Sequence, residues 1–190
     1  MGTYRQNMGF KEYRLETFGR ICPPLYCHTD ESRLADVSRE VLAMPYPKNG
    51  RGVLLTGESR TGKTRTAWML ARNWYCSKDV SLLWYNGGSF SRAMADKYGD
   101  GKAESWHEDL KRAGILLLDD IFKARLTEAV QDALFSVVED RMAYMLPTIL
   151  TLNNDAGGLS SALSPDLVVP MVERLKESCD VFVFDKRLKG

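Results

Sequence analysis

A glycine-rich stretch, Gly57-x-x-x-x-Gly62-Lys63-Thr64, carries the clearest chemistry in the chain. This is the spacing of a phosphate-binding loop, in which glycines let successive backbone N–H groups point at phosphate oxygens. In such a loop Lys63 reaches the β- and γ-phosphates, and the hydroxyl of Thr64 binds Mg²⁺. The pattern therefore predicts a nucleoside triphosphate site for ATP and Mg²⁺. The residues expected to contact the nucleotide here are Gly57, Glu58, Ser59, Arg60, Thr61, Gly62, Lys63, Thr64 and Arg65.

The elements on either side of the loop are those that the motif requires. An apolar run, Val53-Leu54-Leu55, is typical of a buried strand, and the residues from Thr66 to about Cys76 are typical of a helix. A phosphate-binding loop joins a strand to the N-terminus of a helix, whose partial positive charge favours an anion. The loop is therefore expected to work as an anion site.

Two carboxylates form the second chemical landmark. Asp119 and Asp120 directly follow the fully apolar run Ile115-Leu-Leu-Leu118, and Asn153 follows the predicted strand 148–152. Strands of a parallel sheet are buried on both faces, and ligands bind at their carboxyl ends. In phosphate-loop enzymes an aspartate at this place holds Mg²⁺, so Asp119 and Thr64 are the predicted metal ligands.

The remaining pattern alternates strands and helices, which predicts a three-layer α/β/α fold with a parallel five-stranded sheet. Residues 1–20 are interpreted as an N-terminal arm that packs on a single domain, residues 21–190. An extended segment is expected at 21–26, because each proline restricts the residue before it. Asp30 or Ser32 is expected to open the next helix, and Ser89 to cap the helix after the second strand. The other predicted elements are buried strands at 80–85 and 181–184, and helices at 103–113, 127–145 and 166–178.

Composition narrows the class of protein. The 190 residues carry a net charge of +1, so no overall basic field indicates a nucleic-acid partner, and any such surface must be local. There is no apolar run of about eighteen residues and no signal peptide, so neither membrane insertion nor export is indicated. The four cysteines contain no Cys-x-x-Cys pair and are interpreted as reduced thiols, which favours a cytoplasmic location.

Taken together, these landmarks resemble the AAA+ ATPases, and most closely the DnaC/IstB-like branch of helicase loaders and transposition helpers. The resemblance covers about residues 21–185. It rests on the order of the phosphate loop, the Leu118-Asp-Asp-Ile121 segment, Asn153 and the Val172-Glu-Arg-Leu175 segment, with Pro23-Pro-Leu-Tyr26 upstream.

The resemblance implies a role for each matching position. Asp119 would hold Mg²⁺ through water, and Asp120 would polarise the attacking water where many AAA+ proteins have glutamate. Asn153 would position that water, and Arg174 would be an arginine finger that reaches the nucleotide of a neighbouring subunit. Leu25 and Tyr26 would border the adenine. No C-terminal helical lid is expected, and the partner-binding domain of the loaders is missing or reduced to the arm.

The resulting hypothesis is an ATP-hydrolysing protein that acts either in DNA replication as a helicase loader or as a transposition helper. The resemblance implies an ATP-dependent homo-oligomer that binds a replicative helicase or transposase and single-stranded DNA. Phe90, Arg92, Lys97 and Tyr98 are the candidate DNA contacts, because aromatic and cationic side chains suit a single strand. Two alternatives remain: an ATP-gated adaptor with little turnover, and a phosphate-loop kinase, although no lid segment for a kinase is apparent.

Overall fold

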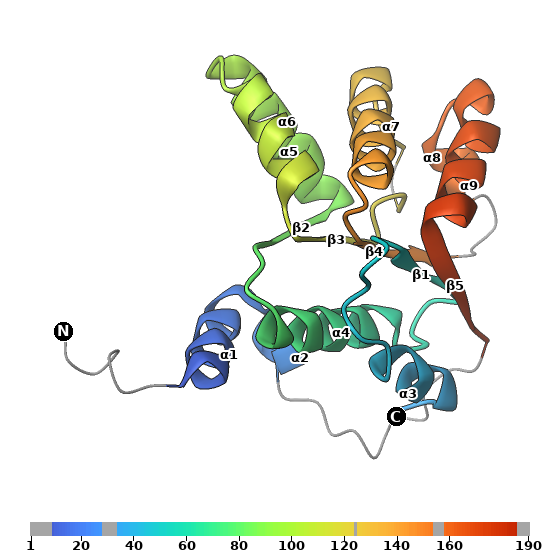
Figure 1. The fold of residues 1–190 in the computed structure, drawn as a ribbon. Helices are drawn as coiled ribbons and strands as arrows, with labels where there is room; N and C mark the ends of the chain where they lie inside the picture. Colours follow the sequence, from blue (N-terminus) through green and yellow to red (C-terminus); the bar gives the residue numbers. More distant parts are fainter. Residues whose placement is uncertain (1–8, 28–33, 124, 154–157, 186–190) are drawn as a thin grey trace.

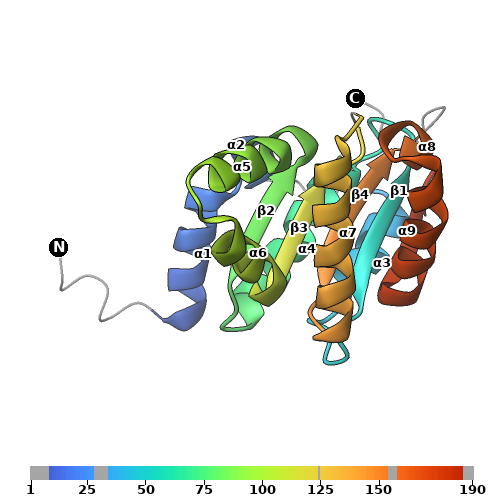
Figure 2. The same cartoon turned by 90° about the horizontal axis from the view of Figure 1, so that it is seen from above.

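Five parallel strands form a single sheet in the order β2-β3-β4-β1-β5 (Figure 1). Figure 2 shows β2, β3, β4 and β1 side by side. The computed structural model describes residues 9–27, 34–123, 125–153 and 158–185. The strands are β1 (Gly52–Gly57), β2 (Leu82–Asn86), β3 (Ile115–Asp119), β4 (Thr148–Asn153) and β5 (Cys179–Phe184). β1 is buried throughout and pairs with β4 on one side and β5 on the other. The predicted α/β fold with a parallel five-stranded sheet is confirmed.

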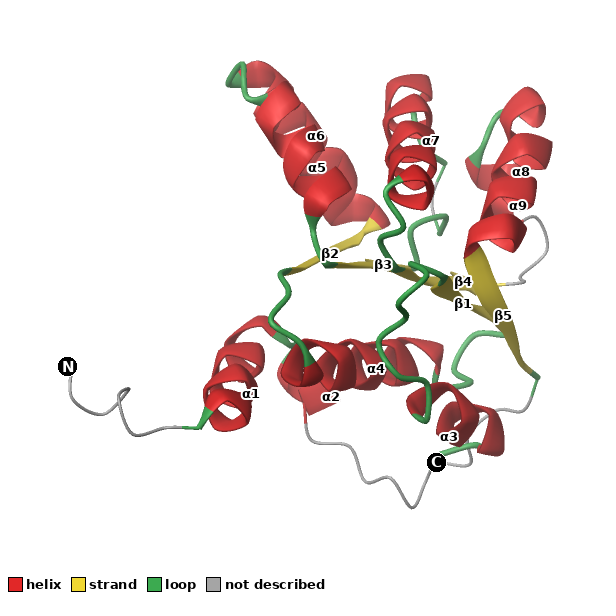
Figure 3. Ribbon diagram, in the orientation of Figure 1, coloured by secondary structure: helices red, strands yellow, loops and turns green. Residues whose placement is uncertain are grey.

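Helices cover both faces of the sheet and make the outer layers (Figures 1 and 3). One layer holds α1 (Phe10–Ile21), α2 (Pro24–Cys27), α3 (Asp36–Leu42) and α4 (Lys63–Ser77). The other layer holds α5 (Gly87–Gly99), α6 (Ala103–Arg112), α7 (Glu128–Ala143), α8 (Gly158–Ala162) and α9 (Pro165–Ser178). None of the helices in the described ranges is long and apolar enough to cross a membrane.

Each face of the sheet has its own apolar core. Trp68 and Trp74 of α4 are 1% exposed and pack with Leu55 of β1 on the first face. Trp106 of α6 and Leu134 of α7 are buried on the second face. Because both faces are covered, the carboxyl edge of the sheet is left as the place where polar side chains can gather.

The N-terminal segment packs against α4. Phe18 of α1 is 2% exposed, and its ring centroid lies 6.0 Å from that of Trp68. Arg14 donates from Nε to the carbonyl of Tyr75 at 3.0 Å, and its guanidinium lies 3.3 Å from the centroid of the Tyr75 ring. α1 continues past residue 20, so the predicted division into an arm and a domain falls inside a helix.

Several local expectations were wrong. Residues 24–27 form a short helix instead of an extended segment, because proline is well tolerated in the first turn of a helix. α3 begins at Asp36 after the extended residue Ala35, whereas Asp30 and Ser32 lie outside the described residues. Residues 158–162 form a helix, α8, that was not predicted.

The second strand and its helix also differ from expectation. β2 begins at Leu82 instead of Val80, and it is only partly buried because it lies at the edge of the sheet. Asn86, not Ser89, caps α5: its Oδ1 accepts from the Ser89 backbone N–H at 2.8 Å. The Ser89 Oγ accepts from the Asn86 N–H at 2.8 Å in return, which completes a capping box.

Candidate active site

The phosphate loop turns tightly at the carboxyl end of β1. Gly57 and Gly62 have φ angles of 138° and 98°, and Arg60 has a φ of 65°. A Cβ atom on Gly57 would lie 2.1 Å from the carbonyl oxygen of Phe184, so only glycine fits between the loop and β5. α4 begins at Lys63, so the N-terminus of this helix lies at the loop. The helix is held in place by its two buried tryptophans.

Lys63 is held inside the loop. Its residue is 4% exposed, and its Nζ donates to the carbonyls of Gly57 at 3.0 Å and Glu58 at 2.5 Å. The Thr61 hydroxyl also donates to the Glu58 carbonyl at 2.8 Å. A buried ammonium group is costly unless it is paired, and a bound phosphate would supply a full negative charge. The loop therefore fits an anionic ligand.

Asp119 connects the loop to the neighbouring strands. Its Oδ1 accepts hydrogen bonds from the Thr64 hydroxyl at 2.8 Å and from the Thr151 hydroxyl at 2.7 Å. A carboxylate and a threonine hydroxyl in direct contact are the oxygen ligands that Mg²⁺ prefers, the remaining positions being filled by water and phosphate. The side chains predicted to hold the metal thus lie together and fit it.

Asp120 has an unusual backbone and a defined side chain. Its φ of 48° places a non-glycine residue in the left-handed region, at a cost of about 1–3 kcal/mol that is characteristic of functional sites. Its carboxylate Oδ1 accepts from the Asn153 side-chain amide at 3.0 Å. Asp120 and Asn153, predicted to act on one water, are therefore in direct contact across β3 and β4.

Thr151 is a site residue that the sequence reasoning missed. It is 0% exposed, accepts from the Asp120 N–H at 2.8 Å and donates to Asp119 at 2.7 Å. Threonine is common in strands and so gives no signal by its type alone. The available signal was its position, because Thr151 precedes Asn153 by two residues and therefore points to the same face of β4.

α2 brings Tyr26 near the acidic residues, while Leu25 is 67% exposed. Burial raises the pKa of the Tyr26 phenol, and the charges of Asp119 and Asp120 raise it further, whereas Arg65 lowers it. The phenol thus lies within electrostatic reach of the predicted metal and water sites. The expectation that Leu25 and Tyr26 border the adenine stays a prediction.

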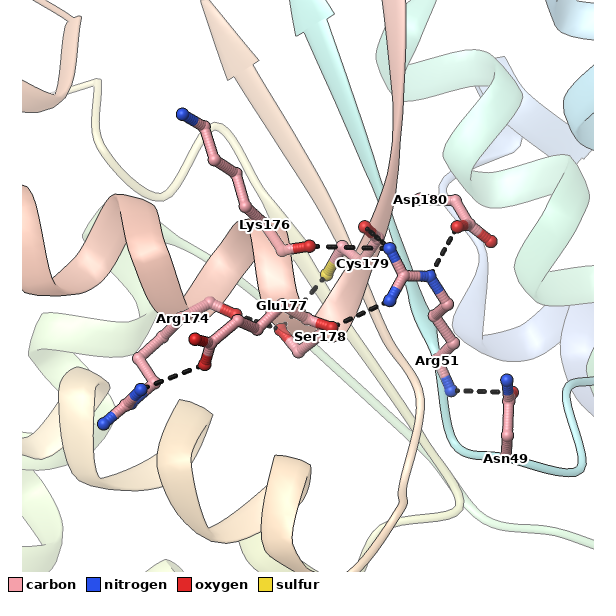
Figure 4. Close-up of polar contacts among 8 residues, drawn as sticks. All are labelled: Asn49, Arg51, Arg174, Lys176, Glu177, Ser178, Cys179 and Asp180. Atoms are coloured by element: carbon pink, nitrogen blue, oxygen red, sulfur yellow. Dashed lines mark hydrogen bonds and ion pairs between the residues drawn. The ribbon is translucent and has the colours of Figure 1, made fainter.

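Arg174 does not join this cluster. Its Nε lies 3.0 Å from a carboxylate oxygen of Glu139, and one terminal nitrogen lies 3.0 Å from a carboxylate oxygen of Glu177. These hydrogen bonds raise the pKa of Arg174, and Figure 4 shows the contact with Glu177. α9 leads into Cys179, which pairs with Gly52 at the start of β1, whereas the phosphate loop follows the end of β1. Arg174 therefore lies toward the opposite edge of the sheet from its own loop.

The candidate DNA contacts fall into two groups. The interpretation of Phe90 as a stacking residue is wrong, because Phe90 is 0% exposed and packs with Tyr85 and Trp106 at centroid distances of 5.7 and 5.2 Å. Arg92 is exposed, Lys97 is half-buried, and Tyr98 is 52% exposed with its Oη 3.2 Å from Nε2 of His107. Only the last three stay available to a ligand.

The family of IstB-like ATP binding proteins matches residues 31–186. The chain belongs to this family. No curated protein sequence matches the chain closely enough to count as a relative. The family match confirms the predicted resemblance to the DnaC/IstB-like branch of AAA+ ATPases.

Solved structures share the fold of this IstB-like protein. A DnaI structure has a TM-score of 0.65 and 19% identity over 85% of this chain and 94% of its own. The DnaC helicase loader has a TM-score of 0.63 and 20% identity over 78% of this chain and 85% of its own. A replication initiator DnaA bound to AMPPCP and single-stranded DNA has a TM-score of 0.63 and 18% identity. The chain covers 46% of that DnaA, so it spans less than half of the initiator.

Proposed function

We propose that this IstB-like protein hydrolyses ATP and acts in DNA replication as a helicase loader, or in transposition as a helper ATPase. One observation carries the proposal: a continuous series of hydrogen bonds links Thr64, Asp119, Thr151, Asp120 and Asn153 at the carboxyl edge of the sheet. The series joins the phosphate loop to the predicted metal ligands and to the predicted water-binding pair.

The loop residues supply the binding chemistry. Backbone N–H groups from Gly57 to Thr64 and the N-terminus of α4 would receive the phosphates, and Lys63 would contribute a full positive charge. Thr64 and Asp119 would hold Mg²⁺. Bound Mg²⁺ supplies positive charge that stabilises the phosphoryl oxygens during transfer.

The hydrolytic step is assigned to Asp120 and Asn153. Asp120 would orient a water and accept its proton while the water oxygen bonds to the γ-phosphorus and the bond to ADP breaks. Asn153 contacts Oδ1 of Asp120, so its amide fixes the carboxylate beside that water. Thr151 would hold both aspartates in place, because it accepts from the Asp120 N–H and donates to the Asp119 carboxylate.

The wider function is proposed from the family and the fold. The DnaC structure is that of a helicase loader, and the DnaA structure holds AMPPCP with single-stranded DNA. We infer that this chain likewise forms an ATP-dependent homo-oligomer in the cytoplasm, with a replicative helicase or transposase and single-stranded DNA as partners. The position of Arg174, away from its own loop, supports an assembly in which it serves a neighbour.

A second function is an ATP-gated adaptor with little turnover, and one observation favours it. Asp120 is a methylene shorter than glutamate, and its Oδ1 is already shared with Asn153. A carboxylate held in this way would reach a water less well, so ATP would persist and its occupancy would be the signal. The kinase hypothesis gains no support from the site, because its polar side chains suit the attack of water.

Phosphate release from ATP, measured with and without single-stranded DNA, tests the proposal. The helicase-loader function predicts turnover that changes when DNA is added and is lost in Lys63→Ala. Tight ATP binding with turnover no faster than in Lys63→Ala would favour the adaptor. Phosphate transferred to a small-molecule acceptor instead of water would overturn both.

A further inference from the structure

Arg51 makes an unusually complete set of contacts at the junction of α9 and β5. It directly precedes β1, and its Nε donates to the Asp180 carboxylate. One terminal nitrogen donates to the Glu177 carbonyl at 2.8 Å, and the other to the Cys179 carbonyl at 2.9 Å and the Lys176 carbonyl at 3.5 Å. Figure 4 shows the guanidinium of Arg51 facing the end of α9.

These contacts lie two to six residues beyond Arg174 in the chain. The last carbonyls of a helix have no partner within it, and a cationic side chain that donates hydrogen bonds to them stabilises the helix end. Arg51 donates hydrogen bonds to the carbonyls of residues 176, 177 and 179. The Ser178 hydroxyl donates to the Arg174 carbonyl at 2.7 Å. The turn that carries Arg174 is therefore anchored to the first residue before β1.

The side chain of Arg174 is fixed separately. Glu139 on α7 and Glu177 on α9 each hold its guanidinium at 3.0 Å. These exposed ion pairs are individually weak, so the direction of the guanidinium depends on where the backbone of the turn is held. Figure 4 places Arg51 and Arg174 on the two sides of the same helix end.

We propose that Arg51 is a positioning residue for Arg174: it fixes the last turn of α9, so that Arg174 is presented to the nucleotide of a neighbouring subunit. The inference rests on the proposed role of Arg174 in trans. An arginine is needed here because its planar fork of five donors can bridge three carbonyls and a carboxylate at once, whereas lysine offers a single point of charge. A displacement of about 1 Å at a catalytic group can cost about 100-fold in rate, so anchoring the turn matters.

The role predicts an effect on one side of the interface only. Subunits with Arg174→Ala keep an intact phosphate loop and act as acceptors, and subunits with Lys63→Ala keep an intact Arg174 and act as donors. Turnover that returns on mixing these full-length variants measures donation of Arg174 across the interface. Arg51→Met can then be added to the donor or to the acceptor, with Arg39→Met, an exposed ion-paired arginine on α3, as the matched control.

We expect Arg51→Met in the donor to lower the recovered turnover at least about tenfold, and Arg51→Lys to lower it less. In the acceptor, Arg51→Met should leave recovered turnover and ATP affinity within about twofold of the parent. Amide hydrogen exchange should become faster in residues 174–179 and stay unchanged in residues 57–64. Asp180→Asn, a milder change to the same contact, covers the case in which Arg51→Met does not fold.

Each outcome decides a separate question. If turnover does not return when the two starting variants co-assemble, the proposed role of Arg174 in trans fails. If turnover returns and Arg51→Met lowers it equally on both sides, or on neither, the positioning role of Arg51 is overturned while that of Arg174 stands.

Discussion

Asn153 donates its side-chain amide to Oδ1 of Asp120 at 3.0 Å, which joins the ends of β3 and β4 at the candidate active site. The left-handed backbone of Asp120, with its φ of 48°, turns the carboxylate into this contact. The contact makes the two residues a unit, so their variants are expected to be non-additive.

Asp120→Asn is expected to separate nucleotide binding from hydrolysis. The amide would accept a proton poorly, so turnover should fall by at least about 100-fold, while the loop and Asp119 still bind Mg·ATP. Asp119→Asn should instead weaken the dependence of binding on Mg²⁺. Single-turnover phosphate release and equilibrium binding measure the two effects, and parental turnover in Asp120→Asn would remove it from the mechanism.

Thr151→Val tests the residue that organises both aspartates. Valine keeps the shape of the side chain but leaves the Asp120 N–H without its acceptor, which costs about 1–3 kcal/mol. We expect turnover to fall about tenfold or more, with a smaller change in ATP affinity. Thr151→Ser keeps the hydroxyl and should restore most of the turnover; parental turnover in Thr151→Val would show that the hydroxyl is not needed.

Local motifs in the sequence determine some of the site residues, and tertiary contacts determine the others. Lys63, Thr64 and Asp119 could be predicted because motif spacing and the carboxyl edge of a parallel sheet determine where they meet. Thr151 was missed because its place two residues before Asn153 indicates only the face of β4, while its contacts with the two aspartates depend on the register between β3 and β4. Phe90 was misjudged because the way α5 packs on α6 decides which of its faces is buried, and that is a tertiary contact.

The surroundings of Arg174 show the same limit at longer range. The Val172-Glu-Arg-Leu175 segment pointed to a functional arginine, but Glu139 lies on another helix, and Arg51 precedes the first strand of the sheet. These partners become neighbours only because β5 pairs with β1 and α9 packs beside α7. Sequence separation hides them, since no local pattern connects an arginine before β1 with the end of α9.

Arg141 is expected to be the most sensitive charged residue for stability. It is 1% exposed and donates to the carbonyls of Leu110, Ala113 and Pro147, each at 2.7 Å. Burial lowers its pKa to about 10, so it stays charged at neutral pH. Arg141→Met would remove the guanidinium donors from the buried carbonyls of Leu110 and Ala113, whereas the Pro147 carbonyl would keep a hydrogen bond from the Leu116 N–H at 3.5 Å.

The expected cost of Arg141→Met is about 3 kcal/mol or more in the free energy of unfolding, because each unpaired buried acceptor costs about 1–3 kcal/mol. Urea denaturation measures it. Arg112→Met is the matched control, since Arg112 pairs with Glu108 at the surface and should change stability by no more than about 0.5 kcal/mol. Similar losses in both variants would show that the carbonyl contacts contribute little.

Binding of single-stranded DNA should depend steeply on salt if α5 contacts the phosphate backbone. Each neutralised phosphate contributes about 0.7 to the slope of log affinity against log salt concentration. Arg92→Ala combined with Lys97→Ala should therefore flatten the slope by about 1.4. Tyr98→Ala should lower the affinity for DNA and leave the slope unchanged. Titrations at several salt concentrations test this, and an unchanged slope in the double variant would place the DNA site elsewhere.

Arg174 is expected to act in an assembly, because its own phosphate loop follows the end of β1 while the turn of Arg174 is anchored before its start. ATP should promote assembly, and turnover per subunit should rise with protein concentration. Arg174→Ala should bind ATP with parental affinity but hydrolyse it about 10³-fold or more slowly, the range of an arginine finger. Glu173→Ala, an exposed neighbour on the same helix, is the matched control and should keep parental turnover. Sedimentation with and without ATP, together with phosphate release over a range of protein concentrations, tests these expectations. Turnover per subunit that stays constant from dilute monomer to assembled protein would show that hydrolysis is completed within one subunit.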